Sequence, residues 1–119
     1  MNIKNKKHTE DACKKARLAI RDTLDVVGGK WKLVLISIMR EDTFRFNELV
    51  KLAEITPRIL SKELSELEMN GLVERRVLDT RPITVEYSLT PYSKTLSSLI
   101  IEMHNWGVNH RKKILKKNK

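Results

Sequence analysis

The segment EITPRILSKELSELEMNGLVERR, residues 54–76, decides the fold class because it holds signals for a complete helix and for a strand after it. The side chain of Thr56 can accept a hydrogen bond from a free amide of the first helical turn, and Pro57 removes a donor that would be unpaired there. Gly71 supplies a left-handed C-terminal cap. We therefore expect a helix over residues 57–70, followed by a strand.

The predicted helix has one apolar face and an opposite polar stripe. Leucines recur at i, i+4 and i+7 and therefore share one buried face: Leu60, Leu64 and Leu67. At about 100° per residue, the opposite stripe consists of Arg58, Lys62, Ser65 and Met69, with Ser61 at one flank. The stripe is basic toward its N-terminal end, so it is either an ordinary solvated helix face or a surface that contacts a partner.

Three further helical patterns precede this segment. Residues 13–27 form an amphipathic pattern that a glycine pair ends. Residues 31–41 are apolar almost all round apart from Lys32 and Ser37, as in a helix enclosed by others. Residues 45–54 form a short helix with its apolar side chains facing inward. Only a few residues separate this short helix from the one that begins at Thr56, which indicates a helix-turn-helix.

Two strand patterns follow Gly71. Residues 72–78 and 83–89 are rich in β-branched side chains, and the link DTRP between them has turn chemistry, which predicts a hairpin. The hairpin carries three arginines: Arg75, Arg76 and Arg81. A basic hairpin after a helix-turn-helix is typical of a winged helix, so the predicted fold is mainly α with a small β-hairpin.

Thr90 and Pro91 repeat the cap-and-proline start and open a long helix that we expect to reach about Lys113. Two apolar stripes run along this helix on opposite sides. The chain's own core can cover one stripe, and the simplest interpretation is that a second subunit covers the other. Which of the two stripes faces the partner subunit stays open. The terminal helices are therefore predicted to form a dimer interface with the candidate residues Leu99, Ile101, Met103, Trp106, Val108 and His110.

The charge of the chain is concentrated at its ends. The 119 residues carry a formal net charge of +9, which suggests a polyanionic partner, but nine of the 24 basic residues lie in the two ends. Residues 9–110 hold 15 basic and 15 acidic side chains. We expect a basic flexible tail over residues 1–12, a winged-helix DNA-binding and dimerisation domain over 13–110, and a basic tail over 111–119.

Several function classes are disfavoured by what the sequence lacks. It has no apolar run that could span a bilayer, no apolar leader, and a single cysteine, so we expect a cytoplasmic protein without a membrane partner. It has no Gly-rich phosphate loop and no nucleophile with a nearby base. Its histidines lack the spacing of metal ligands. We therefore expect no catalytic residue, no metal and no cofactor.

Five segments resemble, in order, the signature of the HxlR-type transcriptional regulators, relatives of the MarR group: GGKWKLVLI (28–36), RFNEL (45–49), ITPRILSKELSELEMNGLVERR (55–76), VEYSLT (85–90) and WGVNH (106–110). The resemblance implies a homodimeric winged-helix regulator, associated with the nucleoid of a bacterium or archaeon. Its recognition helix (57–70) would enter the major groove of a partly palindromic operator, and its wing (75–82) would lie on the backbone or in the minor groove. Repression is the expected sign of regulation, and the effector, a small molecule or a redox signal, is not identified.

The candidate DNA-binding residues are Thr56, Arg58, Ser61, Lys62 and Ser65 on the helix and Arg75, Arg76 and Arg81 on the wing. We expect Arg75 to cover core edges with its stem while Arg76 and Arg81 reach phosphates. The alternative is a winged helix that binds a protein or an RNA. The polar stripe argues against a protein interface, which would favour aromatic anchors.

Cys13 is the only cysteine, and it shares an apolar stripe with Ile20. The first interpretation is a small hydrophobe buried in the core or at the dimer contact. The alternative is a redox sensor, because Lys14, Lys15 and Arg17 lie close in sequence and nearby cations stabilise the reactive thiolate. Oxidation would then produce an intersubunit disulfide, a mixed disulfide or another adduct, since the chain has no second cysteine.

Overall fold

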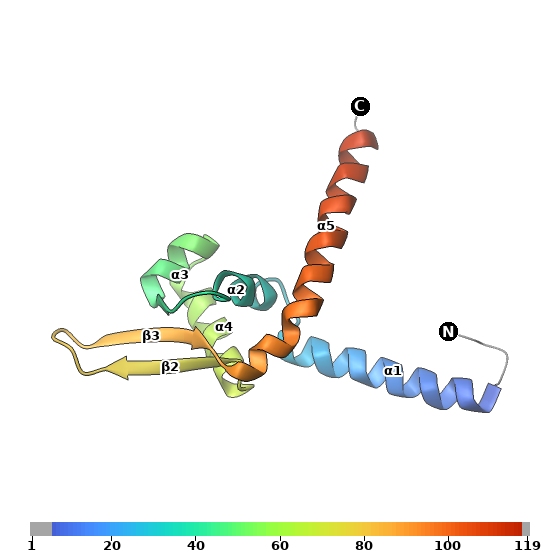
Figure 1. Ribbon diagram of the computed structural model, residues 1–119, viewed down its shortest axis with the longest axis horizontal. Helices are drawn as coiled ribbons and strands as arrows, with labels where there is room; N and C mark the ends of the chain where they lie inside the picture. The colour runs from blue at the N-terminus through green and yellow to red at the C-terminus, as the bar shows by residue number, and fades with distance from the viewer. Residues whose placement is uncertain (1–5, 118–119) are drawn as a thin grey trace.

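The computed structural model describes residues 6–117 and forms a winged helix-turn-helix body from which two long helices project (Figure 1). Its helices are α1 (Lys6–Val27), α2 (Lys32–Ile38), α3 (Phe46–Ala53), α4 (Pro57–Met69) and α5 (Ser97–Lys117), with a 3₁₀ helix over Pro91–Leu96. Its strands are β1 (Phe44–Arg45), β2 (Val73–Leu78) and β3 (Thr84–Leu89). The core lies where α2, α3, α4 and the sheet meet.

Helix α4 begins and ends as its sequence predicts. The Thr56 hydroxyl accepts a hydrogen bond from the backbone N–H of Ile59 at 3.3 Å, and Pro57 occupies the first helical position. At the other end, Gly71 N–H donates to Glu68 O at 3.0 Å and Leu72 N–H donates to Leu67 O at 2.9 Å. This pair of bonds is the Schellman arrangement, and its left-handed residue is Gly71 with φ +74°.

The leucine face of α4 is the centre of the core. Leu60, Leu64 and Leu67 are 0 to 2 % exposed, and they belong to one apolar cluster with Leu35 of α2 and Leu49 of α3. This confirms the face that the leucine spacing predicts.

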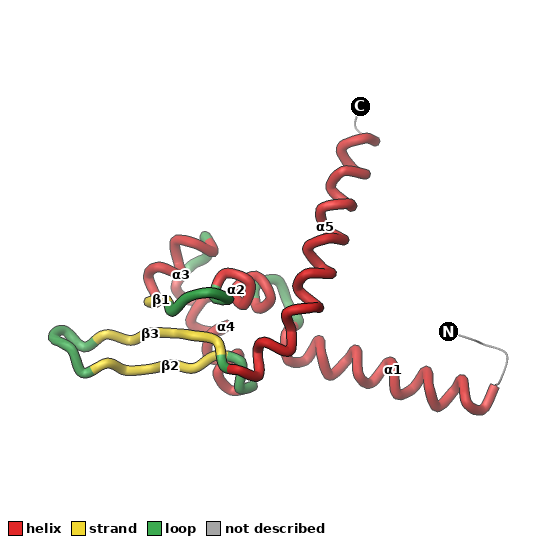
Figure 2. Tube along the Cα trace, viewed as in Figure 1, coloured by secondary structure: helices red, strands yellow, loops and turns green. Residues whose placement is uncertain are grey.

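The sheet has three strands in the order β1-β3-β2, because Phe44 and Arg45 pair with β3 (Figure 2). The sequence analysis predicted only the hairpin and assigned Arg45 to the following helix. Arg45 instead precedes α3 in extended conformation, and its backbone N–H donates to Glu48 Oε1 at 2.8 Å. Two residues give too short a pattern to be read as a strand, so β1 depends on tertiary pairing rather than on local preference.

The terminal helices differ in extent from the predicted ones. Helix α1 begins at Lys6 rather than at residue 13, so residues 6–12 of the expected flexible tail are helical. The segment after Thr90 starts as a 3₁₀ helix, and α5 then continues to Lys117, past the expected end near Lys113 and through most of the expected C-terminal tail. Periodicity locates a helix better than it locates helix ends, because fraying residues carry no pattern.

Both terminal helices extend away from the body, and the hairpin projects on the side opposite to α1 (Figure 1). The radius of gyration is 18.4 Å, whereas a compact chain of this length would have roughly 13–14 Å. Leu18, Ile20 and Leu24 of α1 are 57 to 60 % exposed. The apolar stripe of α1 is therefore uncovered in the single chain, apart from its C-terminal end at Val27.

We predict that Gly71→Ala lowers the free energy of unfolding by about 1 kcal/mol, since an L residue is disfavoured at positive φ. A Cβ atom at this position would have no heavy atom within 4 Å, so the cost comes from the backbone alone. Gly71→Asn is the matched control and should cost less, because asparagine tolerates this conformation better. Urea denaturation measures both variants, and an alanine variant as stable as the wild type would contradict the assigned cap.

Candidate nucleic-acid interface

The polar stripe of α4 is free to contact a partner. Arg58, Ser61, Lys62 and Ser65 are all exposed, on the side opposite to the buried leucines. Within the described residues, neither Arg58 nor Lys62 forms an ion pair. Thr56 is exposed as well, but its hydroxyl oxygen is engaged as the helix cap. The structure thus brings the five candidate residues to the exposed surface of α4 and its N-cap.

One flank of α4 is tied to α2 by a lysine that the sequence analysis noted only as a break in an apolar pattern. Lys32 is 8 % exposed, and its Nζ donates to Glu63 Oε2 at 2.8 Å and to Glu66 Oε2. Glu63 and Glu66 are one turn apart on α4. A charged group in an otherwise apolar helix needs a partner when buried, and that rule was the signal that could have found this cluster.

The ion cluster shifts the pKa of two of its members in the direction that keeps both charged. Burial lowers the pKa of Lys32, but the hydrogen bonds and charges of Glu63 and Glu66 outweigh burial, so its pKa lies above the usual value. The hydrogen bond from Lys32 is the main reason that the pKa of Glu66 lies below its usual value. Lys32 and Glu66 therefore both stay charged around neutral pH.

The hairpin presents its arginines on two faces of the sheet. Arg75 pairs with Tyr87 in register, on the face that also carries Val73 and Leu89, whereas Arg76 pairs with Glu86 on the other face. Arg76 Nη2 also lies 3.9 Å from Glu74 Oε1. Arg81 is exposed in the loop at the tip.

The loop at the hairpin tip is ordered by a threonine. The hydroxyl of Thr80 donates to the Pro82 carbonyl oxygen at 2.8 Å and so spans Arg81. The register places Arg75 and Arg76 on opposite faces of the hairpin, and the expected roles of the three arginines stay a prediction.

The dimer candidates on α5 are all exposed. Val108 and Leu99 are the least exposed at 39 % and 36 %, and Trp106 is the most exposed at 68 %. Trp106 and His110 stack on each other with ring centroids 4.8 Å apart. The expectation that the chain's own core would cover one stripe is wrong beyond Leu96 and Ile100, which are the half-buried residues at the start of this segment.

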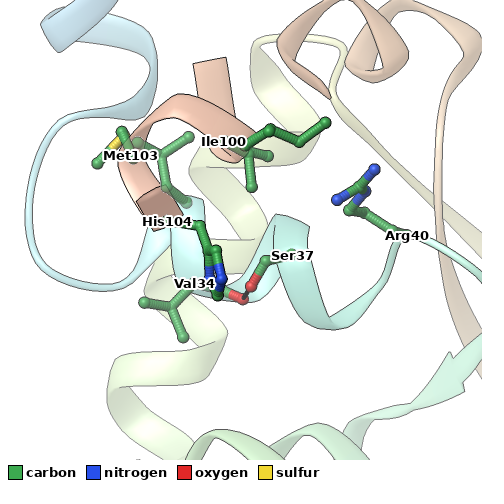
Figure 3. Close-up of a pocket in the computed structure, with 8 residues that line it drawn as sticks. Val34, Ser37, Arg40, Ile100, Met103 and His104 are labelled. Carbon is green, nitrogen blue, oxygen red and sulfur yellow. Dashed lines mark hydrogen bonds between the residues drawn. The ribbon is translucent and has the colours of Figure 1, made fainter. Parts of the chain in front are cut away.

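A hollow of about 500 Å³ lies between α2 and α5. Val34 and Ser37 of α2 and Arg40, just after this helix, line it from one side, and Ile100, Met103 and His104 of α5 line it from the other (Figure 3). The Ser37 hydroxyl donates to the Val34 carbonyl oxygen at 2.6 Å and is thus engaged within its own helix. Since Ile101 and Met103 line this hollow too, it belongs to the surface expected at the dimer contact.

Cys13 is half-buried on α1 and borders a surface hollow together with Glu10, Lys14 and Arg17. It is not part of the core cluster. The expectation of a cysteine buried in the core is therefore wrong, and a dimer contact or a reactive thiol remain as its interpretations.

The model of the HxlR-like helix-turn-helix family matches residues 26–114. The chain belongs to this family. It is 42 % identical over 96 residues to the HTH-type transcriptional regulator YdeP of Bacillus subtilis (strain 168), covering 80 % of this chain and 75 % of that protein. It is 44 % identical over 90 residues to the regulator YybR of the same organism, covering 75 % of this chain and 72 % of that protein.

Solved structures of similar proteins have the same fold. The reduced form of the redox regulator HypR is 40 % identical and superposes with a TM-score of 0.76, covering 82 % of this chain and 98 % of that one. A transcriptional regulator of the MarR family from Enterococcus faecalis V583 is 32 % identical with a TM-score of 0.69, covering 97 % of both chains. These matches confirm the HxlR resemblance and the winged-helix fold class.

Family membership makes this chain a transcriptional regulator with a helix-turn-helix domain, and the family and its named relatives are regulators rather than enzymes. Within the part of the chain that the structure describes, no helix is long and apolar enough to cross a membrane. In that same part, no three side chains of the His, Cys, Asp or Glu type gather closely enough to hold a metal ion.

Proposed function

We propose that the chain binds a partly palindromic DNA operator as a homodimer and represses transcription there. The observation that carries this proposal is the exposed stripe of Arg58, Ser61, Lys62 and Ser65 on a helix whose opposite face is fully buried. In a helix-turn-helix, the second helix lies in the major groove with its N-terminal residues at the base edges. The basic residues lie at that end of α4.

The hairpin supplies the second contact. Arg76 and Arg81 are exposed side chains that can reach phosphates or the minor groove beside the site of α4. Arg75 is on the face of the hairpin that Tyr87 shares, where its stem would cover apolar side chains. The wing thus adds affinity for any duplex, while the base preference comes from α4.

The exposed terminal helices support the proposal of a second subunit. Exposed apolar side chains continue along α1 and α5, and a monomer rarely leaves such long apolar surfaces in water. A two-fold dimer through these helices would present two copies of α4 to half-sites about 34–36 Å apart, or a multiple of that spacing.

A winged helix that binds protein or RNA is the competing function. The outward stripe of α4 has no aromatic side chain, which a protein interface would favour at its centre. The A-form duplex has a major groove too narrow for a helix, which disfavours double-stranded RNA. Salt-dependent binding that prefers one DNA duplex separates the three possibilities.

We predict that Arg58→Ala lowers operator affinity by roughly 1–3 kcal/mol and relaxes base preference, whereas Arg81→Ala weakens all duplexes to a similar extent. Arg111→Ala is the matched control, since it removes the same charge from the exposed end of α5. Fluorescence anisotropy with the operator and with a scrambled duplex at several salt concentrations measures the difference. A double Arg58→Ala, Arg81→Ala variant of unaltered affinity would refute the assigned surface.

For the dimer, we predict that Val108→Glu weakens self-association at least tenfold, because it would bury a charge without a partner. Asn109→Glu adds the same charge at the next, exposed position of α5, outside the two apolar stripes, and should have a smaller effect. Light scattering over a concentration series measures both. If the Val108 variant dimerises like the wild type, this stripe does not face the partner subunit.

We further infer that Cys13 makes the regulator sensitive to oxidants. The support is its position outside the core on α1, beside Lys14 and Arg17, and the similarity to structures described as oxidised and reduced HypR and diamide-treated YodB. In a homodimer the two Cys13 thiols could join as a disulfide, losing two protons and two electrons to the oxidant. Such a bond would constrain the α1 helices and thereby the spacing of the two α4 helices.

We predict that diamide changes operator affinity of the wild type and leaves Cys13→Ser unaffected, since the serine variant cannot form the disulfide. Diamide is the electron acceptor in this reaction and is reduced to the hydrazine. Mobility-shift assays measure operator affinity, and non-reducing gels of the same samples measure the fraction of subunits joined by a disulfide. Equal loss of binding in both proteins would show that Cys13 is not the sensor.

A further inference from the structure

We propose that Lys32 is a positioning residue for DNA recognition, which fixes the rotation of α4 about its own axis by holding Glu63 and Glu66. The inference rests on the proposed function, because rotation of α4 matters only if its outer stripe reads DNA. Lys32 itself is buried, and its ammonium group is enclosed between α2 and α4 rather than exposed on that stripe.

The two carboxylates occupy the flank between the buried face and the DNA-facing stripe. At about 100° per residue, Glu66 lies only about 40° around the helix from Lys62. Glu63 lies closer to the leucine face, and its side chain is 12 % exposed, against 40 % for Glu66. The ammonium group therefore holds α4 at two points one turn apart, along a line beside the proposed contact surface.

Apolar packing and hydrogen bonding constrain different motions of this helix. The leucines set how deeply α4 sits in the body, but apolar contacts are non-directional and resist a small roll weakly. Hydrogen bonds from one ammonium group to two carboxylates depend on distance and angle, so a roll that lengthens one of them is opposed. Lys32 thus supplies a directional constraint that Leu60, Leu64 and Leu67 do not.

A small roll is enough to disturb base recognition. With side chains at a radius of about 5–6 Å, a roll of about 20° displaces a side-chain tip by about 2 Å. Hydrogen bonds to base edges do not survive such a displacement, because their useful range is a few tenths of an ångström. Phosphate contacts of long basic side chains tolerate this displacement better, and they do not distinguish one DNA sequence from another.

We call the cluster of Lys32, Glu63 and Glu66 the clamp. Besides positioning α4, it has an electrostatic effect that must be measured separately. Without Lys32, Glu63 and Glu66 would leave two uncompensated negative charges beside Lys62, and these would repel every duplex regardless of its sequence. Positioning instead affects the operator more than a scrambled duplex. The ratio of the two affinities distinguishes the mechanisms.

The experiment compares four variants with the wild type on an operator selected from random duplexes and on its scrambled form. Lys32→Met removes the ammonium group and keeps the apolar stem. Lys32→Met with Glu63→Gln and Glu66→Gln removes the clamp and the unpaired charges together. Lys32→Glu with Glu63→Lys and Glu66→Gln reverses the ion pair between the helices and leaves an amide donor at position 66 for the new carboxylate, and Lys30→Met is the matched control at an exposed lysine.

We expect Lys32→Met to lower operator affinity at least about tenfold, the value of one base contact, and to lower the affinity ratio between operator and scrambled duplex. The triple variant should recover affinity for the scrambled duplex without recovering the ratio. The reversed pair should restore most of the ratio, and Lys30→Met should leave it unchanged. All measurements are made well below the melting temperature of each variant.

Three results would overturn the inference. An unchanged affinity ratio in Lys32→Met, with only the melting temperature lowered, would make the cluster purely structural. A full recovery of the ratio in the triple variant would assign the effect to charge. In a plot of the logarithm of the affinity against the logarithm of the salt concentration, a slope smaller by about one unit in Lys32→Met would make Lys32 a direct phosphate contact.

A measurement without DNA separates failure of this inference from failure of the proposed function. Residual dipolar couplings of backbone amides report the orientation of α4 relative to α2 in the free protein. We expect them to change for α4 in the triple variant and to return in the reversed pair. If the wild type selects no duplex at all, the proposed function fails, while unchanged couplings in the triple variant would refute the clamp itself.

Discussion

Burial of the leucine face of α4 is the constraint on which the rest of the structure depends. Leu60, Leu64 and Leu67 lose nearly all contact with water, and each such burial stabilises the fold by roughly 1.5–3 kcal/mol. A buried ion pair adds little net free energy, because the cost of desolvating its charges offsets their attraction, so packing decides where α4 lies and the Lys32 cluster can only refine its orientation. Because the leucines commit one face to the core, the stripe of Arg58, Lys62 and Ser65 must face outward.

Helix α2 connects the proposed DNA-binding surface of α4 with the proposed dimer surface of α5. Its Leu35, Ile36 and Met39 are buried in the core, and its Lys32 holds the flank of α4. Its opposite side, with Val34 and Ser37, lines the hollow against α5 (Figure 3). A displacement of α5 at a subunit contact would therefore reach α4 through one short, largely buried helix, which has little freedom to absorb it.

The sequence was sufficient to predict a structural feature where local chemistry and residue pattern agree. Examples are the cap at Thr56, the leucine face, the left-handed Gly71 and the hairpin. It failed where a feature exists only through tertiary contact. Strand β1 has two residues and no pattern of its own, and the partners of Lys32 are two glutamates 31 and 34 positions away. The exposure of the proposed contact residues on α4 followed from helix geometry alone, and the different faces of Arg75 and Arg76 followed from the alternation of side chains along a strand.

The extended terminal helices link the stability of the chain to its association. Most helical stability in proteins comes from packing of an apolar face rather than from intrinsic preference, yet Leu18, Ile20 and Leu24 of α1 stay more than half exposed in the single chain. In the proposed homodimer these side chains and those of α5 would be covered by the partner subunit. Folding of α1 and dimerisation would then be one equilibrium, so the apparent stability would rise with protein concentration. A bond or charge that alters the α1 contact would act on both the dimer and the spacing of its two α4 helices.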